Sequence, residues 1–300
     1  MIKVNKEQVK MCIFEPESKH ETAPSTLEWT GERMIPGKCD LSTFWEHVYR
    51  YKFAASFAKG KKVLDIACGE GYGCYALHRA GAFHVVGVDV SQEACLHARK
   101  KYNLDIRTGD AVDIPVETNT IDLAISFETI EHLEQPELFV KELSRVMKPL
   151  STLIISTPNK DVYRSAGNEN QYHKSEMTID HFTSLLSRYF IIDSLWYQCP
   201  QSVSAYSLVS LAVVHSPWRN MPGFWRLRNM LLPYYLKNNF QYQPDLANNK
   251  ELVTQIILQQ ENFSHQLFNY YSLRRKHKMN SRSFSKSRYI IAVCRKPNNN

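Results

Sequence analysis

Apolar and polar positions along the chain follow two different periods. Seven short apolar runs are typical of buried strands, and they span 61–67, 84–90, 104–110, 121–127, 151–157, 189–197 and 287–295. Apolar residues spaced three and four apart predict helices at about 44–60, 72–81, 91–102, 134–147 and 177–188. Crossover helices join parallel strands, so this alternation favours a parallel sheet covered on both faces. We therefore expect an α/β fold: a Rossmann-like, doubly wound, mostly parallel sheet of seven strands.

The same pattern divides the chain into three parts. Residues 1–58 form an N-terminal segment, irregular up to about residue 40, that ends in a cap helix. Residues 59–197 together with 287–296 form the core domain. Residues 198–286 separate the last two strands by far more chain than a hairpin needs. This aromatic-rich, basic insert is expected to be a helical lid or a subdomain for a substrate or partner.

Composition excludes several classes of protein. The 300 residues are 43% hydrophobic, enough for one large or two modest domains. Seven scattered cysteines, without a CxxC pair or a zinc-like spacing, are expected to be free thiols. No run approaches the roughly 18 apolar residues of a membrane span, and the first residues do not form the apolar stretch of a signal peptide. We expect a soluble, cytoplasmic protein.

The net charge of +7 is unevenly distributed. Residues 216–300 contain 14 Lys/Arg and 3 Asp/Glu, whereas the other 215 residues contain 23 and 27. A basic segment of this kind binds nucleic acid, an anionic glycan, a sugar nucleotide or a membrane surface. The charge alone leaves these partners open.

A glycine-rich loop follows the first predicted strand in "VLDIACGEGYG" (63–73). Glycine at alternate positions lets a ligand approach the backbone, and open α/β sheets bind ligands at this place. The spacing alone does not separate NAD from other adenosine cofactors. Carboxylates at Asp65 and Glu70 are expected to repel a pyrophosphate and to favour a ligand with positive charge.

Acidic residues also end the next three strands. Asp89 is positioned to accept hydrogen bonds from both hydroxyls of a ribose. Asp110 and the Ala111 N–H, in "GDAVDIP" (109–115), match the edge of an adenine, and "FETIEHL" (127–133) follows the fourth strand. Each acid alone is equally compatible with a helix cap or a solvated turn. Four acidic strand ends at one sheet edge predict a single binding crevice.

These motifs together resemble class I S-adenosylmethionine-dependent methyltransferases over about residues 28–198 and the final strand. The resemblance implies S-adenosyl-L-methionine as cofactor and S-adenosyl-L-homocysteine as product. It also implies a set of cofactor-binding residues: Asp65, Ala67, Cys68, Gly69 and Gly71 for the methionine part, Asp89 for the ribose, Asp110 and Ala111 for the adenine, Phe127 and Glu128 for the back of the pocket, and Val90 as a further cofactor-binding residue.

Further segments are similar to one branch of this family. They are "TGERMIPG" (30–37), "WEHVYRYKFA" (45–54), "FETIEHL" (127–133), "STPNK" (156–160) and "NENQYHKSEMTIDHFTSLL" (168–186). The branch comprises methyltransferases found in bacterial surface-polysaccharide pathways and, more distantly, ubiquinone O-methyltransferases. One departure is "KPLS" (148–151), which stands where the family usually has a Lys-Pro-Gly-Gly turn.

Candidate catalytic residues lie beyond the fourth and fifth strands. His132 is the best candidate for the base that removes a proton from a hydroxyl, because imidazole titrates near neutrality. His173 is expected to reach the same crevice, or else to hydrogen-bond to backbone. Arg50 pairs either with the methionine carboxylate or with a surface acid, and Glu131 is expected to face water. We expect no metal, because no acid cluster beyond Glu128 and Glu131 follows the fourth strand.

The sequence therefore predicts an enzyme that moves a methyl group from S-adenosylmethionine to an oxygen of a sugar, glycan or other small acceptor. Two alternatives stay open: an RNA or DNA methyltransferase that uses the basic segment 273–288, and a cofactor-binding scaffold without catalysis. An NAD oxidoreductase is a third, weaker alternative. The acceptor, the choice of O- or N-methylation and the oligomeric state are not determined by the sequence.

Overall fold

The computed structural model describes residues 27, 33–36, 38–39, 41–165, 167, 170–198, 274–275 and 288–298. Its strands are β1 (Lys62–Ile66), β2 (His84–Asp89), β3 (Asp105–Thr108), β4 (Ile121–Ser126), β5 (Met147–Pro158), β6 (Ile191–Gln198), β7 (Arg274–Arg275) and β8 (Tyr289–Arg295). Its helices are α1 (Leu41–Ala55), α2 (Tyr72–Arg79), α3 (Gln92–Tyr102), the 3-10 turn η1 (Ile130–His132), α4 (Pro136–Val146), α5 (Lys160–Ser165) and α6 (Ile179–Leu186).

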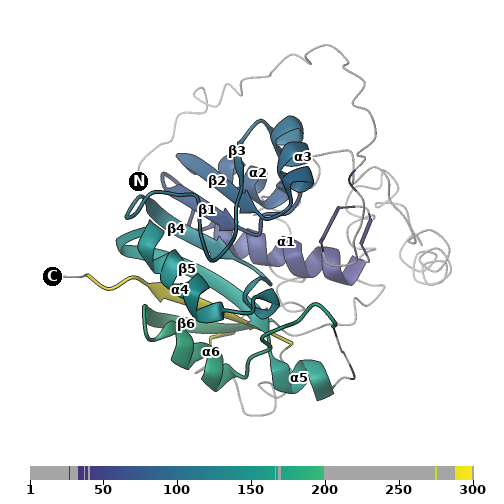
Figure 1. The fold of residues 1–300 in the computed structure, drawn as a ribbon, viewed down its shortest axis with the longest axis vertical. Coiled ribbons are helices and arrows are strands. Elements are labelled where there is room, and N and C mark those ends of the chain that lie inside the picture. Colours follow the sequence, from purple (N-terminus) through teal and green to yellow (C-terminus); the bar gives the residue numbers. More distant parts are fainter. Residues whose placement is uncertain are drawn as a thin grey trace, which may run out of the picture.

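The strands form one mixed sheet in the order β3-β2-β1-β4-β5-β8-β6-β7. The pairs among β1 to β5 are parallel, whereas β8 runs antiparallel between β5 and β6. Figure 1 shows this order, with β8 in yellow between β5 and β6. The predicted α/β, mostly parallel sheet is confirmed, and the two-residue strand β7 adds an eighth member at one edge.

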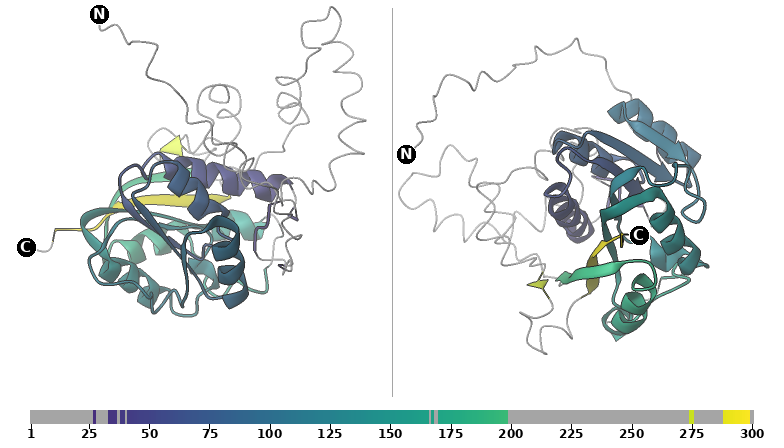
Figure 2. Two further views of the ribbon diagram at one scale, coloured as in Figure 1. Left: turned by 90° about the horizontal axis from the view of Figure 1, so that it is seen from above. Right: turned by 90° about the vertical axis from the view of Figure 1, so that its left-hand side faces the viewer.

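Helices cover both faces of the sheet, because the strand residues alternate between two separate cores. Val63 packs with α1, α2 and α3, and its neighbour Leu64 packs with α4 and α6 on the opposite face. Figure 2 shows α1 and the pair α4 and α6 on opposite sides of the strands. Both faces are buried, which explains why the strands are almost continuously apolar.

Local signals set the helix boundaries. The Ser91 hydroxyl accepts a hydrogen bond from the Ala94 N–H at the start of α3, and Thr178 caps α6 through the His181 N–H. Asn103 ends α3 in the left-handed conformation. The expected helices 72–81, 91–102, 134–147 and 177–188 are all present, within two residues at each end. The first helix ends at Ala55, five residues before Gly60.

Two segments differ from the expected pattern. Strand β5 begins at Met147 instead of residue 151, and its register against β4 shifts after Met147. Within this irregular start Leu150 has φ +63°, and its N–H donates to the Lys296 carbonyl. Helix α5 was not expected from the apolar spacing; it contains no buried residue, so it lacks the apolar face by which a helix is recognised.

The proposed helical insert over 198–286 lies outside the described residues, apart from Gln198 and β7. Most of the N-terminal segment 1–40 lies outside them as well. Among the residues that the structure describes, no helix has the length and apolar composition needed to cross a membrane.

Candidate functional site

A cavity of about 560 Å³ opens at the carboxyl ends of the parallel strands. Its walls come from the loops after β1, β2, β3, β4 and β5, from the segment before α1 and from α1 itself. The lining residues are Arg33, Met34, His47, Tyr51, Ile66, Ala67, Cys68, Gly69, Tyr72, Val88, Asp89, Val90, Gly109, Asp110, Ala111, Phe127, Glu128, Thr129, His132, Leu133, Tyr172 and Lys174. The volume is within the range of small-molecule and cofactor sites.

The glycine loop after β1 forms one wall of the cavity. Ala67 and Gly69 both line it, and both have positive φ, +57° and +55°. A non-glycine residue in this region is strained, and such strain is concentrated at functional sites. Gly71, at φ +87°, is needed for a different reason: a Cβ there would lie 2.8 Å from the Cβ of Ala98 on α3. Gly71 therefore permits packing and does not line the cavity.

Asp89 connects the end of β2 to the glycine loop. Its Oδ2 accepts the Gly69 N–H at 2.8 Å, and its Oδ1 accepts the Ser91 N–H at 2.9 Å. Arg33 approaches the same carboxylate at 4.0 Å. A carboxylate has about four acceptor positions, so Asp89 holds the loop in place and retains capacity for a ligand hydroxyl.

Two further acids line the cavity beyond β3 and β4. Asp110 accepts the Val112 N–H at 3.0 Å, which fixes the turn that also exposes Ala111. Glu128 has φ +52°, and its Oε1 accepts a 2.6 Å hydrogen bond from the Ser156 hydroxyl. Three carboxylates, those of Asp89, Asp110 and Glu128, therefore reach the cavity.

Asp65 and Glu70, which the sequence assigned to the ligand, lie outside the lining. Glu70 is fully buried, and its carboxylate binds the Lys101 ammonium at 2.8 Å and the Tyr102 hydroxyl at 2.9 Å on α3. The expectation that Glu70 repels a pyrophosphate from the loop was therefore wrong. Its carboxylate points into the packing of the loop against α3, where it has cationic and hydroxyl partners of its own.

Asp65 lies beneath the loop, fully buried against α1. The Tyr51 hydroxyl is 3.2 and 3.1 Å from its two oxygens, and the Cys74 thiol is 3.2 Å from one of them. Burial raises the pKa of Asp65 to about 7, although the hydrogen bonds from Cys74 and Tyr51 act in the opposite direction. Asp65 thus acts on the cavity through Tyr51, which lines it.

Arg50 is neither a lining residue nor a surface residue. Only 1% of it is exposed. Its guanidinium donates to the Gln198 side chain at 2.9 Å, lies 4.8 Å from the centre of the Tyr289 ring and is 3.8 Å from Glu128. Arg50 therefore pairs with the Glu128 carboxylate in the protein interior. Both expectations from the sequence, a pairing with the methionine carboxylate and a pairing with a surface acid, are corrected.

Residues 64–155 match the family model described as a methyltransferase domain. A Mycolicibacterium smegmatis protein named a probable S-adenosylmethionine-dependent methyltransferase is 35% identical over 169 residues, which cover 54% of this chain and 65% of the relative. This chain contains a class I S-adenosylmethionine-dependent methyltransferase domain. The family and the fold imply S-adenosylmethionine as its cofactor.

A more distant relative is a ubiquinone biosynthesis O-methyltransferase of Bartonella tribocorum, 34% identical over 104 residues, with 33% of this chain and 42% of the relative covered. The fold is also similar to that of a chain in a solved complex from Haloferax volcanii, which contains the Trm112 methyltransferase activator and a methyltransferase. The TM-score is 0.51 and the identity 14%, and the match covers 86% of this chain and 93% of the other. The match spans at most 65% of the length of these curated relatives.

The cavity of the methyltransferase domain fits the cofactor that the family uses. Its three acids are suited to hydroxyl, amine and sulfonium groups, and the Arg33 guanidinium is suited to a carboxylate. Several lining residues were not expected from the sequence: Arg33, Met34, Tyr72, Tyr172 and Lys174. Four of them lie in segments that resemble the family: Arg33 and Met34 in "TGERMIPG", and Tyr172 and Lys174 in "NENQYHKSEM". The resemblance gave these four positions no role.

The part of the cavity beyond β4 contains His132, in the turn η1. Its Nδ1 contacts the Tyr172 carbonyl at 3.3 Å. His173 does not line the cavity: its side chain is buried, and its Nδ1 lies 3.1 Å from the Glu176 carboxylate. The two imidazole rings nevertheless lie 5.0 Å apart, edge to face.

Glu131 lies beside these two histidines and does not face water. Only 1% of it is exposed, and its Oε2 accepts from the Thr157 hydroxyl at 3.2 Å. Burial, followed by the charge of Glu128, holds the pKa of Glu131 well above its ordinary value. The expectation of a solvated Glu131 was wrong, because the 3-10 turn directs this side chain towards β5 and away from the surface.

Proposed function

We propose that the protein transfers the methyl group of S-adenosylmethionine to an oxygen of a small acceptor such as a sugar or glycan. The supporting observation is a single cavity with two chemically different ends. Asp89 and Asp110 line one end, and His132, Tyr172 and Lys174 line the other. A cofactor at the first end and an acceptor at the second bring the two reactants together.

In this proposal the cofactor lies along the carboxyl ends of β1, β2 and β3. Asp89 accepts the ribose hydroxyls, and Asp110 with the Ala111 N–H binds the adenine edge. The backbone from Ala67 to Gly69 holds the methionine part, and Arg33 pairs with its carboxylate. The bound cofactor supplies an electrophilic methyl group on a sulfonium sulfur. Alignment in an enclosed site provides much of the rate, with effective molarities of about 10⁵ M or more.

The acceptor end supplies groups for a hydroxyl substrate. His132 lines the cavity and is the proposed proton acceptor, which contributes roughly 10²–10⁴-fold. The Nδ1–H donates to the Tyr172 carbonyl, because a carbonyl can only accept, and this leaves the lone pair on Nε2. Lys174 offers a positive charge to an acidic or phosphorylated acceptor.

An oxygen acceptor is favoured by the named relatives, several of which are ubiquinone biosynthesis O-methyltransferases. The sugar or glycan class rests on the sequence resemblance to the polysaccharide-pathway branch, through "TGERMIPG", "WEHVYRYKFA", "FETIEHL", "STPNK" and "NENQYHKSEMTIDHFTSLL". The rival nucleic-acid function depends on residues 273–288, most of which lie outside the described residues. That rival, the catalytically silent scaffold and the cytoplasmic location all stay predictions from the sequence.

Isothermal calorimetry with S-adenosylhomocysteine tests the cofactor site. We expect binding to the full chain and at least about 10-fold weaker binding to Asp89→Ala, because hydrogen bonds to a charged group contribute about 1.5–3 kcal/mol. Asp193→Ala is the matched control, since Asp193 pairs with Arg295 at the far edge of the sheet. Uptake of NADH in place of S-adenosylhomocysteine would contradict the proposal.

Methyl transfer itself is tested with cofactor labelled on the methyl group and a panel of sugar nucleotides, glycans and RNA. We expect label on a sugar hydroxyl, and loss of about 10²–10⁴-fold in kcat for His132→Gln with unchanged S-adenosylhomocysteine affinity. Label on RNA alone would favour the nucleic-acid rival. Full activity of His132→Gln would remove His132 from the reaction.

A further inference from the structure

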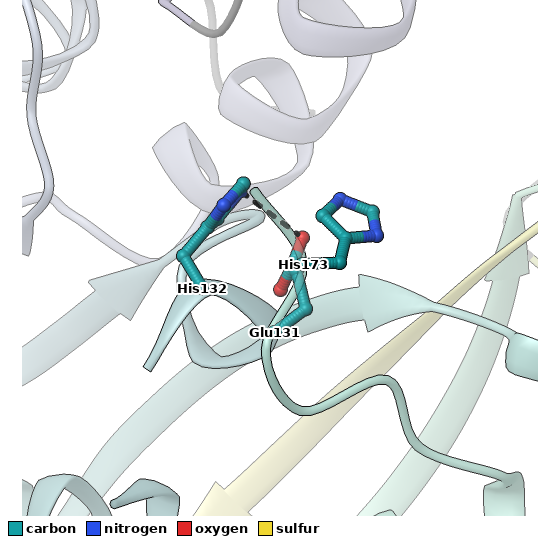
Figure 3. Close-up of side chains that lie close together, drawn as sticks. All are labelled: Glu131, His132 and His173. Carbon is teal, nitrogen blue, oxygen red and sulfur yellow. Dashed lines mark ion pairs between the residues drawn. The ribbon is translucent and has the colours of Figure 1, made fainter. Parts of the chain in front are cut away.

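Three potential metal ligands gather at the acceptor end of the cavity. Glu131 and His132 come from the turn η1, and His173 comes from the loop between α5 and α6, some 40 positions later. One ligand atom from each lies within 4.8 Å of the other two. Figure 3 shows the Glu131 carboxylate between the two imidazole rings.

The Glu131 carboxylate has an unsatisfied oxygen at this point. Its Oε1 is buried and accepts no hydrogen bond within the described part of the chain. The His132 Nε2 lies 4.0 Å from this oxygen, which is too far for a hydrogen bond. Buried carboxylate oxygens without a donor are costly, and an unassigned ion is one of the ordinary explanations.

In each of the three side chains, a second polar atom has a hydrogen-bond partner, as is usual for metal ligands in proteins. The His132 Nδ1 contacts the Tyr172 carbonyl, and the His173 Nδ1 contacts the Glu176 carboxylate. Both partners are acceptors, so each ring carries its proton on Nδ1 and its lone pair on Nε2. The Thr157 hydroxyl binds the other oxygen of Glu131. Metal-ligating histidines almost always have such a carbonyl or carboxylate partner.

We propose that Glu131, His132 and His173 bind a divalent transition-metal ion, with Zn²⁺ the best match to the donor set. Two imidazole nitrogens and one carboxylate oxygen are the ligands of open zinc sites, whereas Mg²⁺ prefers oxygen ligands and water. The ligand atoms of a tetrahedral site are about 3.3 Å apart, given bonds of about 2.0–2.2 Å, so the three groups close by roughly 1.5 Å on binding. The side chain of His132 is 31% exposed and has room to move.

A three-ligand site leaves one coordination position open, and His132 borders the cavity. This part of the inference rests on the proposed function. An acceptor hydroxyl at the open position loses its proton to water more readily, because the ion stabilises the alkoxide. His132 is then a metal ligand, and the ion replaces its imidazole as the group that activates the hydroxyl. The acids after the fourth strand did not predict this cluster, because His173 joins it from a loop some 40 positions later in the chain.

The full chain, stripped with a chelator, tests the site by titration with Zn²⁺ alone, with neither cofactor nor acceptor present. We expect the native protein to bind one Zn²⁺ ion tightly per molecule. His132→Ala, His173→Ala and Glu131→Gln should not bind this ion. The matched control is His181→Ala, because His181 is exposed on α6 and outside the cluster. We expect Glu176→Gln to bind this ion with about 10–100-fold weaker affinity.

Folding is checked by the melting temperature without metal, which the variants should share within a few degrees. Zn²⁺ should then raise the melting temperature of the native protein and of His181→Ala only. If His173→Ala fails to fold, the test is made with His132→Ala, because the His132 side chain is partly exposed. Equal zinc binding by the native protein and His132→Ala overturns the site, and so does binding of Mg²⁺ without Zn²⁺.

The two proposals fail separately. Zinc binding without S-adenosylhomocysteine binding would retain the metal site and contradict the function. S-adenosylhomocysteine binding and methyl transfer that survive the chelator unchanged would retain the function and contradict the metal's role in it. Loss of methyl transfer on chelation, with recovery on addition of Zn²⁺, supports both.

Discussion

The Tyr51 hydroxyl lies 3.2 and 3.1 Å from the two carboxylate oxygens of Asp65, which are completely buried. One residue comes from the helix before the sheet and the other from the first strand, so this contact fixes α1 over the glycine loop. Tyr51 also lines the cavity. The hydrogen bond therefore connects the stability of the domain to the shape of its site.

Tyr51→Phe should lower the free energy of unfolding by about 1–3 kcal/mol, because a buried carboxylate loses a donor. The loss should be larger at pH 8 than at pH 5, since the hydrogen bond favours the charged form of Asp65. Denaturant unfolding at both pH values measures it. Tyr172→Phe, at an exposed tyrosine, should stay within about 0.5 kcal/mol of the native protein. A loss of equal size at both pH values would show that the Tyr51 hydroxyl does not favour the charged form of Asp65.

The stability of the domain should fall as pH rises from about 4 to 7. Burial raises the pKa of Asp65 from its ordinary value near 3.8 to about 7, so over this range the folded state holds a proton that the unfolded chain has released. The contribution is full below pH 3.8 and lost by pH 7, with a slope of at most about 1.4 kcal/mol per pH unit. Asp65→Asn should lack this slope, so subtracting its unfolding free energies from those of the native protein should isolate a contribution that falls between about pH 4 and 7.

Asp122→Asn is the matched control for that pH profile. Asp122 is partly exposed, and although burial acts in the opposite direction, the Lys148 ammonium and the Lys62 N–H hold its pKa below the ordinary value. Its contribution is therefore lost only as pH falls below about 4. Between pH 5 and 7 the subtracted profile of this variant should be flat. A slope of the same sign in both variants would show that Asp65 is not the titrating group.

Gly73→Ala should destabilise the domain even though alanine is the better helix former. A Cβ at this position of α2 would lie 2.1 Å from the Tyr51 ring, so the ring must move away from Asp65 and from the cavity. We expect a loss of about 1–3 kcal/mol, measured by denaturant unfolding, and weaker S-adenosylhomocysteine binding.

A double-mutant cycle separates this clash from a general effect of the methyl group. In a Tyr51→Leu background the tip of the ring is absent, and Gly73→Ala should then be neutral or stabilising by up to about 1 kcal/mol. Additive effects of the two substitutions would mean that Tyr51 and Gly73 are not in contact.

Leu150→Gly should stabilise the domain. Leu150 has φ +63° and is 57% exposed, so the substitution relieves about 1–2 kcal/mol of backbone strain without loss of packing. The greater conformational freedom of glycine in the unfolded chain offsets about 0.5–1 kcal/mol of this stabilisation. The matched control is Leu96→Gly, at a leucine 54% exposed within α3, which should lose about 1 kcal/mol. Midpoints of denaturant unfolding measure both, and a shift of the same sign in the two variants would refute the strain at Leu150.

The sequence by itself determined the fold and the edge of the sheet where ligands bind. Apolar runs at strand length and apolar spacing at helix length are local properties, and they located the seven main strands and five of the helices. Asp89, Asp110 and Glu128 were found in the same way, because the carboxyl ends of parallel strands meet at one edge. The "KPLS" departure also proved informative, because Leu150 has the left-handed backbone that glycine adopts most readily.

The tertiary structure decided which side chains at that edge reach the cavity. Glu70 and Glu131 both follow a strand end in sequence, yet one turns to Lys101 and the other to Thr157. His132 and His173 lie together although 40 positions separate them. Such choices depend on side-chain direction and on partners from distant segments, which no local period encodes, because burial rewards whichever orientation provides a hydrogen-bond partner.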